Sequence, residues 1–457
     1  MASIVAACAT PPIDRYLLQA QADANDVRFK GARGVLSRDG SKAVLEALKK
    51  KSPDSDVLER HIAVEQELTE NPLSIGNKVA LLEDGPNTYA AMLAAIGSAK
   101  HHVHMETYIF EADDIGRQFA AALAERARAG VKVRLMYDSA GSFKTPKEFF
   151  KQLSEGGVEV VEFNPIAAAT VLKDGFAAIN HRDHRKLTIV DGRVAFLGGI
   201  NISGVYGSLA GSINRERGRD DQPFEKRPWR DTQTRIEGPV VADLQRAYLG
   251  QWARQKKEPV IEDKAYFPAL PAQGSLVVRA IEGSPSDQGV NAMYIAFVSA
   301  VENAEKEILI MNPYFVPHES LRRSLSAAAK RGVDVRLILP SHSDSPFAYH
   351  AGHSFYGGLL ESGVKIYERK DRMLHAKTAV IDGVWSTVGS TNLDWRSLLH
   401  NDEVNVVVLG PEFASQMAAV FRADLAQSEE ITLQGWRNRP LSDRLKEISA
   451  RLWARFL

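Results

Sequence analysis

Two histidines of this chain stand in the same chemical setting. Each is followed by a lysine at the second position and an aspartate at the seventh, so the pattern His-x-Lys-x4-Asp occurs twice. A glycine and an asparagine follow each histidine at the same distances, 14 and 17 residues on. One match to so short a pattern arises by chance, but two copies with the same downstream residues indicate one site built from two halves of the chain. The copies are His184, Lys186, Asp191, Gly198 and Asn201, then His375, Lys377, Asp382, Gly389 and Asn392.

These residue types suit the cleavage of a phosphodiester. The ester is anionic and its alkoxide leaves poorly, so cleavage needs a nucleophile, a proton donor and cations around the non-bridging oxygens. Two histidines, two lysines and two asparagines supply these functions without a metal ion. One imidazole would attack as the neutral base while the other donates a proton, roles accessible near the ordinary imidazole pKa of about 6.5. We therefore expect no metal and no other cofactor.

The spacing within each motif predicts its local structure. The histidine and the lysine are two residues apart, so on a strand they face the same side. Asp191-Gly192 and Asp382-Gly383 each lie between hydrophobic runs, which predicts a tight hairpin turn. Asp191 and Asp382 belong to the catalytic motif, but their parity is opposite to that of the histidines. This favours a structural or turn role over direct catalysis.

A catalytic imidazole also needs an acceptor for its second ring nitrogen. Aligning the two halves of the chain pairs Asp231 with Glu403, each at the start of a strand-like run. Carboxylates at corresponding positions in both halves suit this task. Asp231 and Glu403 are therefore the predicted orienting groups.

The repeat extends well beyond the motifs. Gly130-Val-Lys-Val-Arg-Leu resembles Gly332-Val-Asp-Val-Arg-Leu, and Tyr108 and Tyr314 each follow a strand-like run. The order is kept and only loops change length, which indicates a duplicated domain. Apolar periodicity predicts strands over 103–110, 131–137, 307–311 and 333–339 and helices over 115–129, 147–154, 239–256 and 318–331. This alternation predicts an α/β fold with helices covering a largely parallel or mixed sheet.

We expect four segments: an N-terminal extension (1–75), a first domain (76–260), a second domain (275–430) and a C-terminal helix (431–457). In the extension, 41–51 and 54–69 are predicted helices with Ser41 and Asp54 as N-caps, packed on the first domain. The small apolar residues before Cys8 resemble the end of a bacterial lipoprotein signal, which would make Cys8 a lipid anchor.

Two polar or amphipathic segments leave alternatives open. In the last helix, Leu441, Leu445, Ile448 and Leu452 form an apolar stripe, which fits an interfacial helix. A helix docked on its own domain is the preferred interpretation. The basic residues between Asn201 and Trp229 are either a solvated loop or a head-group contact.

Composition excludes some classes of protein. The chain has 57 basic and 57 acidic residues, a balance that argues against a general nucleic-acid-coating protein. Its lone cysteine excludes an internal disulfide. No run approaches the roughly 20 apolar residues of a membrane-spanning helix, so we expect a soluble or peripheral protein.

The paired motifs resemble the signatures of the phospholipase D superfamily over about residues 78–420. Asn312-Pro-Tyr-Phe-Val-Pro317 and Gly389-Ser-Thr-Asn-Leu-Asp394 resemble its bacterial cardiolipin synthase branch. The resemblance implies two duplicated α/β/α sandwich halves with the site at their interface. It also implies a phosphohistidine on His184 and protonation of the departing alcohol by His375. The residues then expected to bind phosphate or substrate are Lys186, Lys377, Gly199, Asn201, Ser390, Asn392, Tyr108 and Tyr314.

The leading functional hypothesis is a phosphatidyltransferase of cardiolipin synthase type that acts on phosphatidylglycerol or a similar lipid. The alternatives are a hydrolytic phospholipase D, a nuclease and a non-catalytic phospholipid-binding protein. The resemblance further implies peripheral attachment to the membrane of a bacterial cell envelope. No nucleic-acid partner is expected.

Overall fold

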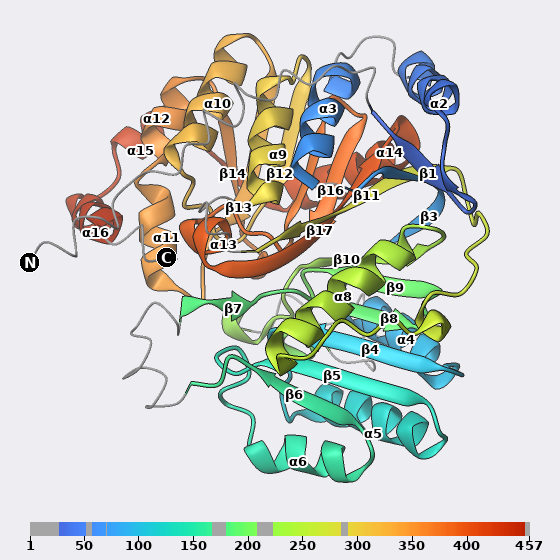
Figure 1. The fold of residues 1–457 in the computed structure, drawn as a ribbon. Coiled ribbons are helices and arrows are strands. Elements are labelled where there is room, and N and C mark those ends of the chain that lie inside the picture. Colours follow the sequence, from blue (N-terminus) through green and yellow to red (C-terminus); the bar gives the residue numbers. More distant parts are fainter. Residues whose placement is uncertain are drawn as a thin grey trace, which may run out of the picture.

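The computed structural model describes residues 27–51, 57–69, 71–166, 180–207, 223–284 and 291–452. Cys8, Asp54 and most of the basic loop after Asn201 lie outside these ranges. The described strands form a mixed 18-stranded sheet with helices on its faces. Figure 1 shows two stacked units, with the first half of the duplication in cyan and green below the second half in yellow to red.

The first half combines parallel and antiparallel strands. β4 (His102–Thr107), β5 (Lys132–Asp138) and β6 (Glu159–Phe163) are parallel neighbours. From β4 the sheet continues through β8 (Leu187–Val190), β9 (Val194–Gly198), β10 (Thr232–Glu237) and β3 (Leu73–Glu83), each antiparallel to the one before. The helices of this half are α4 (Asp84–Gly97), α5 (Asp114–Arg128), α6 (Lys147–Glu155) and α8 (Val241–Lys256).

The second half repeats this arrangement. β12 (Glu307–Met311), β13 (Asp334–Pro340) and β14 (Lys365–Arg369) are parallel, and β18 (Ser428–Ile431) runs antiparallel at the edge. β15 (Thr378–Ile381), β16 (Trp385–Gly389), β17 (Asn401–Leu409) and β11 (Leu276–Gly283) continue from β12. Its helices are α9 (Ala292–Glu302), α10 (Glu319–Lys330), α11 (Pro346–His353), α12 (Tyr356–Glu361), α13 (Trp395–Leu399), α14 (Pro411–Leu425), α15 (Leu433–Arg437) and α16 (Leu441–Leu452).

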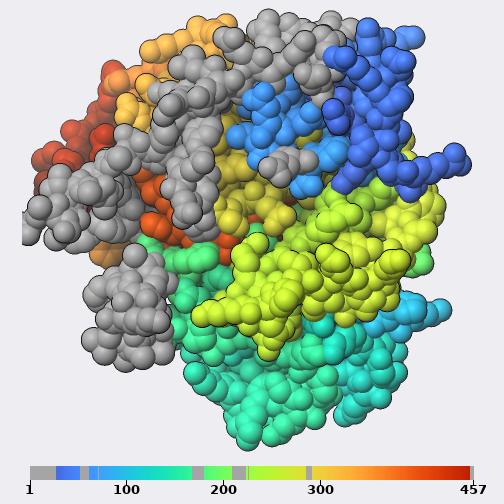
Figure 2. Space-filling model, viewed as in Figure 1, coloured from blue at the N-terminus to red at the C-terminus, as the bar shows by residue number. Residues whose placement is uncertain are grey.

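Three apolar cores define the layers. One contains α4, α5 and α6 with strand residues of the first half, and another contains α9, α10 and α12 with strand residues of the second. The third contains α8 and α14 together with strand residues of both halves. In Figures 1 and 2, α8, in yellow-green, lies at the front of the boundary between the halves. The expected pair of α/β/α sandwiches is therefore confirmed.

The two halves are also joined through one long strand. Ser74 and Asn77 of β3 pair with β11, whereas residues 78–83 pair with β10. A short parallel pairing of β7 (Arg182–Asp183) with β17 forms a second link. Both links fix the position of one half relative to the other, and the second lies directly before His184.

The helices of the N-terminal extension pack on the second half, so the expectation that they pack on the first was wrong, although Phe29 and Lys30 pair with β3 of the first half. α3 (Val57–Thr69) lies against α9, and the buried Glu65 accepts a hydrogen bond from the indole nitrogen of Trp385 at 2.7 Å. The extension also contributes strands β1 (Phe29–Gly31) and β2 (Gly34–Val35). The cause lies in β3, whose first residues pair with β11, so the segment that leads into it emerges beside the second half.

The start of the first predicted helix also differs. α2 begins at Arg38, so Ser41 lies inside the helix and is not its N-cap. Ser37 takes that place, because its hydroxyl accepts a hydrogen bond from the backbone N–H of Gly40 at 3.1 Å. The Ser41 hydroxyl instead accepts from the backbone N–H of Phe29 at 3.2 Å. It ties α2 to β1.

Candidate active site

Each motif folds as a hairpin, as its spacing predicted. β8 and β9 form the first hairpin, and β15 and β16 form the second. The turn residues Asp191 and Gly192 have φ angles of 52° and 61°, and Asp382 and Gly383 have 52° and 64°. Positive φ at both central positions is the type I′ turn that suits the twist of adjacent strands. The turns return each chain so that its asparagine approaches the histidine.

The motif aspartates are held at the turns, away from the cavity that the histidines line. Asp191 accepts hydrogen bonds from the backbone N–H groups of residues 100–102 at 2.8–3.2 Å. Asp382 does the same for residues 305–307 at 2.8–3.1 Å. Each carboxylate thus fixes the motif hairpin to the loop that enters β4 or β12. This geometry gives both residues a structural role.

The two histidines line one cavity of about 310 Å³ at the junction of the halves. Six predicted residues meet there: His184, His375, Asn201, Asn392, Tyr108 and Tyr314. The other lining residues are Ile109, Arg182, Trp229, Asp344, Ser345, Ala348, Asp394, Arg396 and Asn401. Both halves therefore contribute to a single site.

The orienting carboxylates are exchanged between the halves. His184 of the first motif donates from Nδ1 to Glu403 of the second half, with its two oxygens at 3.0 and 3.1 Å. His375 of the second motif donates from Nδ1 to Asp231 of the first half at 2.7 Å. In both cases the contact fixes the tautomer and leaves Nε2 as the reactive nitrogen. Neither half alone contains a complete histidine–carboxylate pair.

Burial sets the protonation states of the empty site. It lowers the pKa of His184 to about 4, and burial together with the charge of Lys377 holds the pKa of His375 well below its usual value. Burial also raises the pKa of Asp231 to about 7. Although burial alone would raise the pKa of Glu403, the contacts with His184 and Lys186 hold it below its usual value. Both imidazoles are therefore neutral at pH 7, and Glu403 is ionised.

The motif lysines lie beside the histidines. Lys186 Nζ donates to the backbone carbonyl of His184 at 2.5 Å and lies 5.1 Å from the centre of the Tyr108 ring. Lys377 Nζ donates to the carbonyl of His375 at 2.5 Å and lies 3.0 and 3.1 Å from the two ring nitrogens. Burial lowers the pKa of Lys186 to about 7 and that of Lys377 to about 8. Neither lysine is among the residues that line the empty cavity, but an anion bound between the two histidines would raise both lysine pKa values.

The motif asparagines differ in how they are held. The side-chain oxygen of Asn201 accepts from the backbone N–H of Ile109 at 3.0 Å, and its amide donates to the Tyr206 hydroxyl at 2.9 Å. The side-chain oxygen of Asn392 is buried without a hydrogen-bond partner among the described residues. Asn392 is thus the asparagine left available to a bound group.

Gly199 and Ser390 do not reach the cavity. A Cβ atom at Gly199 would lie 2.2 Å from a carboxylate oxygen of Asp231, so glycine leaves room for that carboxylate. The fully buried Ser390 accepts a hydrogen bond from the backbone N–H of Val404 at 3.0 Å. Gly199 lies against the carboxylate of Asp231, and Ser390 lies against the residue that follows Glu403. Neither residue makes the substrate contact expected of it.

Several residues around the histidines could not be identified from the sequence repeat. The Tyr206 hydroxyl lies 3.3 Å from Nδ1 of His375, and the Trp229 ring centre lies 5.2 Å from that of His375. Arg182 lines the cavity beside His184, two positions away from it. Residues two apart on a strand lie on one face, so the spacing between Arg182 and His184 could have identified Arg182 from the sequence.

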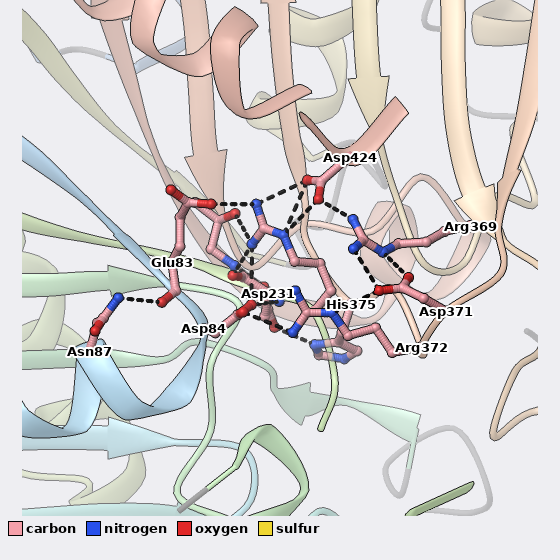
Figure 3. Close-up of polar contacts among 11 residues, drawn as sticks. Glu83, Asp84, Asn87, Asp231, Arg369, Asp371, Arg372, His375 and Asp424 are labelled. Atoms are coloured by element: carbon pink, nitrogen blue, oxygen red, sulfur yellow. Dashed lines mark hydrogen bonds and ion pairs between the residues drawn. The ribbon is translucent and has the colours of Figure 1, made fainter. Parts of the chain in front are cut away.

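A buried ion-pair network lies behind His375 and crosses between the halves (Figure 3). Arg230 donates from Nε to Asp424 at 3.0 Å, and Arg372 donates to Asp84 at 2.8 Å. Arg369 also pairs with Asp424. The carbonyl of Arg230 accepts from the backbone N–H of His375 at 2.7 Å, so the network fixes the position of this histidine. Its members are Glu83, Asp84, Arg230, Arg369, Asp371, Arg372 and Asp424.

Comparison with known proteins agrees with this geometry. Residues 92–210 and 297–425 match the family described as "Cardiolipin synthase, PLD-like domain". A cardiolipin synthase of Alkalihalophilus pseudofirmus is 34% identical over 409 residues, covering 89% of this chain and 77% of the relative. The major cardiolipin synthase of Bacillus subtilis is 33% identical over 377 residues, covering 82% and 74%.

A solved structure shares the fold. The phosphatidylserine synthase of Haemophilus influenzae superposes with a TM-score of 0.65 at 14% identity, covering 86% of this chain and 99% of that one. Together with the two matched segments and the relatives, each of which extends over most of the chain, this gives a plain assignment. The chain belongs to the cardiolipin synthase family of phospholipase D-like proteins.

Proposed function

We propose that this protein is a phosphatidyltransferase of cardiolipin synthase type. It moves a phosphatidyl group from phosphatidylglycerol, or a similar glycerophospholipid, first to His184 and then to an alcohol. The observation that carries the proposal is the exchange of carboxylates between the halves, which orients two neutral imidazoles into one cavity. The names of the curated relatives supply the lipid class.

The first step forms a covalent intermediate. Nε2 of neutral His184 attacks phosphorus while Nδ1–H donates to ionised Glu403, which stabilises the positive charge that develops on the ring. The bond from phosphorus to the glycerol oxygen breaks, and Nε2–H of His375 protonates that oxygen. His375 is neutral in the empty site, so it takes up its proton when the phosphate enters. Lys186 and Lys377 then bind the non-bridging oxygens.

The second step restores the enzyme. The hydroxyl of a second lipid gives its proton to His375 and attacks phosphorus, and the bond from phosphorus to His184 breaks. Water in place of the lipid alcohol would give phosphatidic acid by the same path. Transfer and hydrolysis therefore use one intermediate and differ in the acceptor.

Incubation of the purified protein with phosphatidylglycerol vesicles tests the proposal. We expect cardiolipin and free glycerol, identified by mass spectrometry, and loss of both in the His184→Ala variant. Phosphatidic acid as the main product would identify a hydrolytic phospholipase D. Absence of cardiolipin, phosphatidic acid and free glycerol would overturn the proposal, and cleavage of single- or double-stranded DNA in a parallel assay would point to a nuclease.

The proposal includes peripheral attachment to a bacterial membrane, because the substrate is a membrane lipid. Among the described residues, no helix combines the length and apolar character needed to cross a bilayer. Lipid attachment at Cys8 remains a prediction, tested by labelling with a palmitate analogue in a bacterial host. Label in the wild type that is lost in Cys8→Ser would support it.

A further inference from the structure

The last described helix packs with its polar side inward. α16 lies against α11, and its buried residues are Glu447 and Ala450. Arg439 donates to Glu447 from Nε at 2.8 Å and from a terminal guanidinium nitrogen at 2.6 Å. Ala450 belongs to a small core with Ala348 and Ala351 of α11. A salt bridge and small side chains therefore hold the helix in place.

Its apolar side is exposed. Leu441, Leu445, Ile448 and Leu452 expose 73%, 67%, 62% and 78% of their surface. At 3.6 residues per turn these four residues form one stripe, nearly opposite Ala450 on the helix. An amphipathic surface helix normally buries its apolar stripe. The preferred expectation that α16 docks is confirmed, but the stripe is not the docked face.

The helix beneath α16 forms part of the cavity wall. Ser345 caps α11, and both Ser345 and Ala348 line the cavity that contains the histidines. Phe347, between them, is 63% exposed. In Figure 1, α16 lies at the left edge of the molecule, next to α11 and on the side where β7 lies. α16 therefore lies next to a helix of the active-site wall, with its exposed stripe turned away from that helix.

The first half also places an exposed aromatic residue after one of its parallel strands, in a turn, whereas Phe347 lies in the first turn of α11. Phe143 follows β5, as Phe347 follows β13, and it is 72% exposed. The neighbouring Ser142 hydroxyl donates to the carbonyl of Tyr108, which lines the cavity, at 3.1 Å. Both phenylalanines thus lie beyond the carboxyl ends of parallel strands, the sheet edge to which Tyr108 and Ser345 belong. Each half contributes one to the surroundings of the cavity.

Basic groups accompany these apolar side chains. Lys144 lies 5.9 Å from the ring of Phe143, and Arg451 lies 5.3 Å from the ring of Phe355. On α16, Arg444 and Arg451 flank one side of the stripe by helical spacing. Its two acidic residues are engaged, Glu447 with Arg439 and Asp443 with Lys446 at 3.4 Å. The face therefore combines exposed apolar groups with a positive border.

We propose that this face, made of the α16 stripe with Phe347 and Phe143, inserts into the interfacial layer of an anionic phospholipid bilayer. Apolar side chains bordered by arginine and lysine are the features of interfacial helices, whose binding grows with buried apolar area and with anionic lipid. Docking by this face brings the cavity to the bilayer that contains the lipid head group. The inference rests on the proposed function for the identity of that lipid, but vesicle binding itself needs no turnover.

Co-sedimentation of the full chain with vesicles of phosphatidylglycerol and phosphatidylcholine tests the proposal. The Leu445→Glu/Ile448→Glu variant is expected to bind at least about tenfold more weakly, because it places two charges in the stripe. The matched control is Ser442→Glu/Ser449→Glu, which adds the same charge to exposed positions of α16 outside the stripe. We expect the control to bind at least about tenfold more tightly than the stripe variant, because both carry the same two added charges and only the stripe variant loses apolar surface. A thermal melt of each variant verifies folding.

Each outcome decides a different point. Equal vesicle binding by the stripe variant and the wild type would overturn the proposal. A wild-type dimer that the stripe variant converts to monomers, with vesicle binding unchanged, would assign the face to a second copy. Binding to pure phosphatidylcholine as tight as to the mixture would overturn the proposed requirement for anionic lipid.

Activity separates this inference from the function on which it rests. The stripe variant should lose about tenfold activity on vesicles but keep wild-type activity on a water-soluble aryl phosphodiester. Stripe-dependent vesicle binding by a wild type that forms no product from phosphatidylglycerol would leave the docking face standing and overturn the proposed function. Equal loss on both substrates would show damage to the catalytic site and overturn the assignment of these residues to docking.

Discussion

The two halves of the molecule are built on one plan, yet their histidines lie in different electrostatic environments. His184 donates to both oxygens of Glu403, whose pKa is held below its usual value. His375 donates to one oxygen of Asp231, whose pKa burial raises to about 7. The ring of His375 is also next to a lysine Nζ, at 3.0 and 3.1 Å, and to the Tyr206 hydroxyl.

This difference separates two chemical roles that the duplicated motif leaves equivalent. An ionised acceptor makes the opposite ring nitrogen of His184 more basic and more nucleophilic. Beside Lys377 and a carboxyl group of high pKa, His375 gains its proton only when an anion neutralises the lysine charge. It is then suited to donate that proton to a leaving oxygen. The geometry supports His184 as the nucleophile and His375 as the acid.

Removal of either imidazole should have the largest effect and break the symmetry most clearly. His375→Ala should still form phosphohistidine from an aryl phosphodiester, because an aryl oxide leaves with little protonation. His184→Ala should form none, because the atom that accepts phosphorus is gone. Detection on a gel after an alkaline quench of protein labelled from a ³²P diester measures this, because phosphohistidine is stable in base and labile in acid. Label on His375 in the His184→Ala protein would reverse the assignment.

Removal of one carboxylate charge should have the next largest effect. Glu403→Gln should slow the labelling of His184 by up to about 10⁴-fold, the loss seen when an orienting aspartate becomes an amide. Asp231→Asn should slow this step less on an aryl substrate, since it acts through the acid. Single-turnover labelling measures both rates. Equal losses would mean that the two pairs do not differ in role.

Asp231→Asn should also change how stability depends on pH. Folding raises the pKa of this carboxyl from about 3.8 to about 7, so between these values the native state holds a proton that the unfolded state has lost. Stability then falls as pH rises through this window. The asparagine variant lacks this loss, so its Tm should fall less than the wild-type Tm between pH 5 and pH 8. A parallel decline in both proteins would contradict the raised pKa.

Much of this architecture could be predicted from the sequence, because the same pattern of strands and helices occurs in both copies of the repeat. The hairpins at Asp191 and Asp382 and the pairing of Asp231 with Glu403 needed only spacing and alignment. The exchange between halves was not predictable, since alignment shows equivalent residues but not which half they face. The packing of the N-terminal extension was missed for a related reason. It depends on the pairing of β3 with β11, which are far apart in the chain.

The lysines offer a milder test of the same asymmetry. The pKa of Lys186 is about 7 and that of Lys377 about 8, so raising the pH from 7 to 9 neutralises first Lys186 and then Lys377 in the empty site. When an anion binds, both lysines regain their positive charge, so the complex takes up protons from solution. Its affinity should fall by up to about tenfold per pH unit for each proton taken up. Inhibition by inorganic phosphate of aryl-diester cleavage measures this.

Methionine at either position separates the two contributions. Lys186→Met should remove a contribution to the fall that begins near pH 7 and continues to pH 9, whereas Lys377→Met should remove only the additional steepness that begins near pH 8. Phosphate inhibition that does not change between pH 7 and pH 9 in the wild type would show that both lysines remain charged without a ligand.

The smallest effects should come from the turns, where the halves are most alike. Asp191 and Asp382 each accept hydrogen bonds from three backbone N–H groups, and Asp382 is the more buried. Asp191→Ala and Asp382→Ala should each lower the free energy of unfolding by about 1–3 kcal/mol, because three backbone N–H groups lose a charged acceptor. Urea unfolding measures this, and we expect the larger loss for Asp382→Ala. The labelling rate per folded molecule should stay within about twofold to threefold of wild type, since neither carboxylate reaches the cavity. A much larger loss of rate with unchanged stability would return these aspartates to the catalytic group.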